Sequence, residues 1–157
     1  MKIKTSELTD VALDWAVMTC GLPDGRQLTA VRIYGGDISY QPTSDPSIRR
    51  YWRPSEDWAQ GGPIIEREDI SVIRCDDDYE KDSRGFTTTK RLTVWFAEHG
   101  GGHSSQNSYG SQGDFYGMAF HIDEGDGLYG PTPLIAAMRC YVASKLGDEI
   151  EIPEELA

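Results

Sequence analysis

Residues 130–139, with the sequence GPTPLIAAMR, could bind an anion. Thr132 is a typical helix N-cap, and Pro133 follows where a missing N–H costs nothing. The free amides and positive dipole end of a helix start attract phosphates and carboxylates. Because Arg139 adds a positive charge further along the same helix, we expect Thr132 and Arg139 to hold an anionic group. Ordinary capping of a packing helix is the alternative interpretation of Thr132 and Pro133.

A second segment offers aromatic faces and glycine amides. Trp52 and Trp58 flank a turn that continues into residues 60–62, and Tyr129 directly precedes the first segment. An indole can stack on a base, although filling a core is its commoner use. We therefore expect these two segments to form one binding site for a small ligand. Its predicted ligand-binding residues are Trp52, Trp58, Gln60, Gly61, Gly62, Tyr129, Thr132 and Arg139.

Two helices are expected near the ends of the chain. Apolar spacing predicts the first from about Thr9 to Cys20, with Gly21 ending it. The second follows Thr132, stops at Gly147, and is expected to turn one apolar stripe to a sheet while Arg139 and Lys145 reach outward. Between them, Ser55 could cap a single helical turn that residues 61–63 (GGP) break before the chain enters Ile64 and Ile65.

Strand patterns lie between the two helices. Residues 28–34, 70–75, 91–97 and 115–122 alternate or are β-branched, and loops rather than crossover helices separate them. The expected fold class is α+β, a mainly antiparallel sheet packed by an N-terminal and a C-terminal helix. Residues 1–157 are expected to form a single compact domain, with a Gly/Ser-rich loop at about 99–114 that is either a mobile tip or a lid ordering around a partner.

No catalytic pattern stands out. His99 and His103 are four residues apart, but within a glycine-rich stretch that spacing does not place them on one helical face. The sequence has no nucleophile elbow, phosphate loop or dinucleotide fingerprint. We assign no catalytic residue, metal ligand or cofactor, and favour a non-enzymatic role.

Charge and cysteine content narrow the partners. The net charge of −11 and the pI near 4.6 argue against binding duplex nucleic acid, which requires basic groups. The same charge suits solubility or a basic protein partner. Three widely spaced cysteines predict reduced intracellular thiols, and no apolar run is long enough to cross a membrane.

Four stretches resemble one family of phage proteins. These are residues 57–68 (DWAQGGPIIERE) and 130–147 (GPTPLIAAMRCYVASKLG), together with 1–8 (MKIKTSEL) and 12–17 (ALDWAV). Together they are similar to the NinX-like family of small bacteriophage accessory proteins. The resemblance implies a protein that works in the cytoplasm of an infected bacterium. The family has no general catalytic assignment that could be carried over to this chain. Residues 76–125 depart from the family pattern.

These observations predict a non-enzymatic phage accessory protein that binds a small anionic or nucleotide-like ligand, sequestering a host defence signal. Phosphate would meet the helix start and Arg139, and a base would stack on the aromatic rings. One alternative is an acidic interaction module that blocks a host protein through charges such as residues 76–78. The other is a nucleotide hydrolase that uses His99 or His103. Because small binding domains often build pockets between subunits, we also expect a homo-oligomer.

Overall fold

The computed structural model describes residues 1–21, 29–34, 37–42, 45, 47–75, 78–81, 87–90, 94–99 and 127–156. Helices and antiparallel strands both occur, so the expected α+β class is confirmed. In chain order the elements are β1 (Lys2–Lys4), the 3-10 helix η1 (Thr5–Glu7), α1 (Asp10–Thr19), β2 (Thr29–Tyr34), β3 (Asp37–Gln41), β4 (Arg50–Tyr51), α2 (Trp58–Arg67), β5 (Ile70–Cys75), β6 (Asp78–Lys81), β7 (Thr87–Lys90), β8 (Val94–His99), β9 (Gly127–Gly130), α3 (Pro133–Leu146), β10 (Glu149–Glu151) and the 3-10 helix η2 (Glu154–Leu156).

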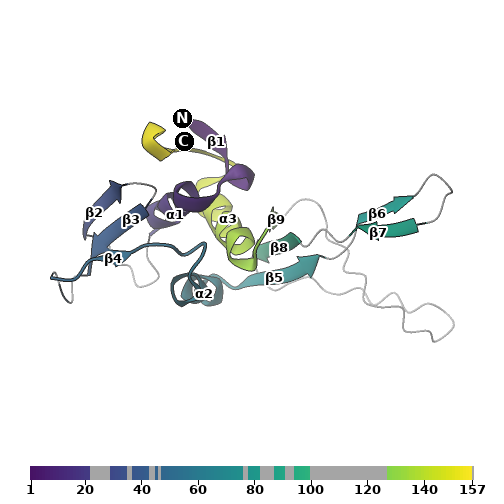
Figure 1. Ribbon diagram of the computed structural model, residues 1–157, viewed down its shortest axis with the longest axis horizontal. Coiled ribbons are helices and arrows are strands. Elements are labelled where there is room, and N and C mark those ends of the chain that lie inside the picture. The colour runs from purple at the N-terminus through teal and green to yellow at the C-terminus, as the bar shows by residue number, and fades with distance from the viewer. Residues whose placement is uncertain are drawn as a thin grey trace.

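Helix α3 lies at the centre of the structure (Figure 1). It contacts both other helices and all three strands of the β5–β8–β9 sheet. A helix covered on so many sides needs apolar residues around most of its circumference. The expectation that Arg139 reaches outward is therefore wrong, whereas Lys145 is exposed as expected. The buried residues of α3 are Leu134, Ala136, Ala137, Met138, Arg139, Cys140, Tyr141 and Val142.

The strands of the described residues form four small antiparallel sheets. Two have three strands each, in the orders β2-β3-β4 and β5-β8-β9. The hairpin β6–β7 extends away from the helices (Figure 1). The fourth sheet pairs β1 with β10, so that Ile3 lies opposite Ile150 and the two ends of the described chain are side by side. Among the described helices, none is both long and apolar enough to cross a membrane.

The hydrophobic core joins elements that are distant in sequence. α1 and α3 supply most of its residues, and Ile38, Trp52 and Ile64 add side chains from β3, the loop before α2, and α2. The predicted first helix is confirmed as α1, and the predicted strands at 28–34 and 70–75 as β2 and β5. The strand expected at 91–97 is shifted to β8, while the one at 115–122 and residues 100–114 of the Gly/Ser-rich loop lie outside the described residues.

Helix α2 corrects the expectation of a single turn broken by residues 61–63. Asp57, not Ser55, caps the helix by accepting a hydrogen bond from the Ala59 amide at 2.9 Å, and the helix passes through Pro63. Proline disfavours a helical residue before it because its ring meets the preceding Cβ. Gly62 has no Cβ, so this clash is absent and the helix continues.

Gly61 and Gly62 therefore have different roles, which predicts effects of alanine that differ in size. A Cβ on Gly61 would lie 2.4 Å from the Pro54 carbonyl oxygen and 2.7 Å from Leu134 Cδ2, whereas one on Gly62, apart from its two neighbours in the chain, would come no closer than 3.9 Å, to Trp58. We expect Gly61→Ala to destabilise the fold by about 1–3 kcal/mol through overpacking. We expect Gly62→Ala to change stability by less than about 1 kcal/mol, because the gain in helix propensity is opposed by the contact between the new Cβ and the Pro63 ring. Urea unfolding measures both, and a stable Gly61→Ala variant would contradict the packing of α2 on α3.

Candidate functional site

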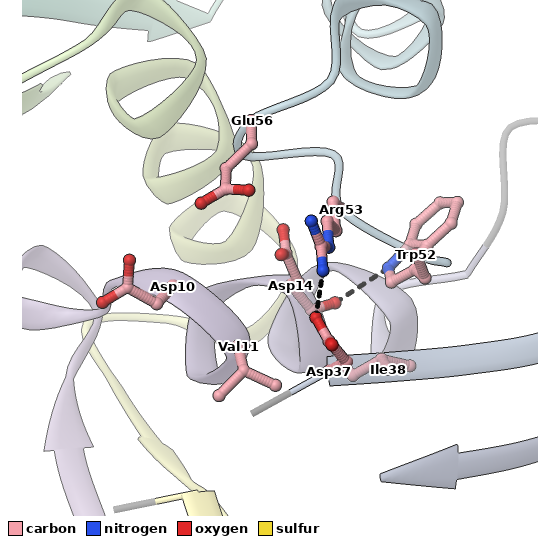
Figure 2. A pocket seen from close by; sticks show the side chains of 8 residues that line it. All are labelled: Asp10, Val11, Asp14, Asp37, Ile38, Trp52, Arg53 and Glu56. Carbon is pink, nitrogen blue, oxygen red and sulfur yellow. Dashed lines mark hydrogen bonds and ion pairs between the residues drawn. The ribbon is translucent and has the colours of Figure 1, made fainter. Parts of the chain in front are cut away.

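A cavity of about 160 Å³ lies where α1, the start of β3 and the segment before α2 (residues 52–56) meet. Carboxylates dominate its lining, with one cation, one indole and two aliphatic side chains beside them. This volume is below the roughly 300–1,000 Å³ of pockets that enclose drug-sized ligands. The cavity therefore suits one small charged group. Its lining residues are Asp10, Val11, Asp14, Asp37, Ile38, Trp52, Arg53 and Glu56 (Figure 2).

Asp14 connects α1 to the segment before α2. Its backbone carbonyl accepts a hydrogen bond from Trp52 Nε1 at 2.9 Å, and its carboxylate Oδ1 accepts one from the Ser55 amide, also at 2.9 Å. The residue is only 4% exposed, and its carboxylate points from α1 toward Arg53 and Glu56 (Figure 2). No hydrogen bond from the described residues reaches the second oxygen, Oδ2. Asp14 thus brings a buried carboxylate to the cavity with half of its acceptors unused.

Burial changes the protonation of this carboxylate. Desolvation raises the pKa of Asp14 from 3.8 to about 6, and the nearby negative charge of Glu56 raises it further, while the hydrogen bonds from Ser55 and the charge of Arg53 oppose the rise. At neutral pH the group is mainly ionised, so the fold holds a poorly solvated negative charge. A cation that entered the cavity would stabilise that charge.

Arg53 offsets only part of the negative charge of the cavity. Its guanidinium forms an ion pair with Asp37 and lies over the Tyr51 ring, with Cζ 5.2 Å from the centroid. The Arg53 amide donates to Gln60 Oε1 at 3.0 Å, which fixes the backbone at the start of the segment. The carboxylates of Asp10 and Glu56 have no ion-pair partner in the described part of the chain. The cavity consequently retains an excess of negative charge.

At the start of α3, where we expected an anion to bind, most of the backbone amides donate to groups of the protein itself. Thr132 caps the helix as predicted, accepting from the Ile135 amide at 3.2 Å, and its carbonyl accepts from the Ala136 amide at 3.1 Å. Gly130 lies so close that a Cβ there would be 2.5 Å from the Ala136 nitrogen. The capping that the sequence predicts is confirmed, and it leaves fewer amides for a ligand.

Arg139 is committed to the protein itself. It is 9% exposed, and its Nε donates to the Leu8 carbonyl at 2.8 Å while Nη1 donates to the Tyr129 carbonyl at 2.7 Å. Desolvation lowers its pKa. These bonds hold η1 and β9 against α3, so in this arrangement the guanidinium acts as a structural cross-link rather than an exposed anion ligand.

The other predicted site residues divide between two places. Trp52 is 5% exposed and lines the acidic cavity, and Gln60 bonds to the backbone at its edge. Trp58 and Tyr129 are 57% and 47% exposed, at the start of α2 and in β9. Gly61 packs on Leu134 and so brings α2 to the first turn of α3, with Gly62 beside it.

The candidate catalytic residues occupy a different region. His99 ends β8, and its Nδ1 lies 3.0 Å from the Glu68 carbonyl oxygen, whereas His103 lies outside the described residues, as do Asp76 and Asp77 of the acidic run. Cys20 and Cys140 are free thiols. Within the described residues, no three His, Cys, Asp or Glu side chains lie close enough together to hold a metal ion.

Sequence reasoning missed the acidic cavity. One signal was present, because Asp14 interrupts the apolar residues of a predicted helix and aspartate is rarely fully buried without a partner. The contributions of Asp37 and Glu56 depend on tertiary contacts between segments that no local pattern relates.

The raised pKa of Asp14 predicts a pH-dependent stability. Between about pH 4 and pH 6 the folded state keeps a proton that the unfolded state has lost, so the free energy of unfolding falls as pH rises, by about 3 kcal/mol in total. Asp14→Asn removes this group and can still accept from the Ser55 amide. We expect urea unfolding to show that the variant gains about 2 kcal/mol relative to the wild type between pH 4 and pH 8, since part of the total change lies below pH 4. Gly62→Ala, which changes no ionisable group, serves as the control, and a difference that is independent of pH for Asp14→Asn would contradict the burial of a charge here.

Comparison with known proteins identifies the family. The family model described as Bacteriophage P22, NinX matches residues 4–86, more than half of the 157 residues. The chain therefore belongs to the phage NinX family. A search among curated proteins gives no significant match. Every residue that lines the acidic cavity lies inside the matched range, whereas the start of α3 lies beyond it.

Proposed function

We propose that this NinX-family protein is a non-enzymatic phage accessory protein that blocks a host protein by binding it. In this proposal the acid-lined cavity receives a positively charged group of the partner. The supporting observation is Asp14, a buried residue that lines the cavity and whose carboxylate Oδ2 receives no hydrogen bond from the described residues. Buried charges in proteins are normally paired, so an unpaired one at an opening favours a charged ligand.

The charge of the whole chain supports the same kind of partner. A net charge of −11 attracts basic surfaces and accelerates their association at low salt. Neither histidine nor cysteine lines the cavity, and its carboxylates and one arginine are groups that can hold a charged partner. Binding without turnover is the function that this set of groups serves best.

A second candidate is the binding of a small anionic or nucleotide-like ligand, by which the protein would sequester a host defence signal. The exposed rings of Trp58 and Tyr129 favour it, because they lie on elements next to the start of α3. This candidate requires Arg139 or other cations to be released to the ligand. Both candidates place the protein in the cytoplasm of the infected bacterium.

Native mass spectrometry of the protein purified from infected cells separates the two candidates. We expect the wild type to retain a host polypeptide, and the double variant Asp14→Asn/Glu56→Gln to lose it, because removing one side of a desolvated charge pair costs about 2–5 kcal/mol. Glu149→Gln is the matched control, since Glu149 pairs with Lys2 outside the cavity.

Other results of the same experiment have clear meanings. A retained small molecule that survives the double variant would support the second candidate, and a chemically altered one would indicate a hydrolase. Retention of nothing by the wild type would contradict binding as the function. The spectra also give the number of subunits, for which we propose a homo-oligomer.

A further inference from the structure

We infer that the cavity recognises the guanidinium of an arginine side chain in preference to a lysine ammonium or a metal ion. The inference rests on the proposed function, because it names the chemical group through which the partner binds. Its basis is the arrangement of the acceptors, the unmet hydrogen-bonding groups and the walls of the cavity.

The acceptors are spread around the cavity rather than gathered at one point. Asp10 and Asp14 come from α1, and Glu56 comes from the segment before α2 (Figure 2). None of these carboxylates belongs to a group of three that could hold a metal ion, within the part of the chain that the structure covers. A guanidinium has five N–H donors arranged around a plane and can therefore reach carboxylates in several directions.

Two polar groups beside the cavity are only partly satisfied by the protein. Asp14, which is more than nine-tenths buried, lines the cavity and offers Oδ2, to which no described residue donates. Ser55, 2% exposed, has a hydroxyl that lies near the same carboxylate but forms no well-aligned hydrogen bond in the described part of the molecule, and its amide is bonded to that carboxylate. An incoming donor would therefore satisfy a group that the fold leaves unmet.

The walls suit a planar, weakly hydrated cation. Trp52, Val11 and Ile38 contribute apolar surface, and a guanidinium loses less hydration than an ammonium when it contacts such a surface. The volume of about 160 Å³ is comparable with cavities that hold one benzene ring, which is enough for a guanidinium. Arg53 already places a guanidinium on one wall, bonded to Asp37, and leaves the remaining carboxylates to a second one.

Small model cations test this preference directly. The Trp52 indole N–H and the Ser55 amide N–H both donate to Asp14, so their NMR signals report on changes at the cavity. We would titrate the wild type at pH 7.5 and constant ionic strength with methylguanidinium, methylammonium and Mg²⁺, and record ¹⁵N–¹H NMR spectra. We expect saturable shifts of both signals with methylguanidinium, and an affinity for methylammonium about tenfold lower.

Variants decide whether the response comes from the cavity. Asp14→Asn should reduce the methylguanidinium affinity about tenfold, and Glu56→Gln should reduce it while leaving the buried hydrogen bonds in place. Glu149→Gln should leave it unchanged. Equal or stronger binding of methylammonium or Mg²⁺, or shifts that do not saturate, would overturn the inference. A host polypeptide retained by a protein without guanidinium preference would overturn this inference alone, whereas guanidinium binding without a retained polypeptide would overturn only the proposed function.

Discussion

Asp14 joins α1 to the segment before α2 through hydrogen bonds to both its main chain and its side chain. The Trp52 indole bonds its carbonyl, which seats that ring in the core, and the Ser55 amide bonds its carboxylate. Together these two bonds place residues 52–56 over α1 and enclose the cavity. This arrangement removes the Asp14 carboxylate from most of its solvent, which is unfavourable for its charged form. A cation in the cavity would stabilise that charge.

The start of α3 and the cavity near α1 differ in how their charged groups are paired. At the start of α3, Thr132 caps the helix and Gly130 packs against its first turn. The Arg139 guanidinium donates to the carbonyls of Leu8 and Tyr129, so the protein itself satisfies these polar groups. Near α1, the acidic side chains outnumber the single arginine, and one of them is buried. The buried cation Arg139 therefore binds the protein's own backbone, whereas the cavity presents carboxylates.

Local patterns predicted local structure well. The cap at Thr132, the extent of α1 and the strands β2 and β5 follow from residue type and spacing, which act over a few residues. Helix α2 was misjudged because Gly62 relieves the usual restriction before proline, and because the need for glycine at position 61 arises only from tertiary contacts with Pro54 and Leu134. The cavity was missed because Asp14, Asp37 and Glu56 meet only after folding, and Arg139 was placed outside because α3 is covered on nearly every side.

The most direct test of this account is the protonation of Asp14 itself. A carbon-13 NMR titration that follows the Asp14 carboxyl carbon reports its pKa without reference to stability or to any partner. We expect a midpoint near pH 6, because the carboxylate is buried beside Glu56. A midpoint near that of a solvated aspartate, at about pH 4, would contradict it, since the cavity would then hold no poorly solvated charge for a cation to stabilise.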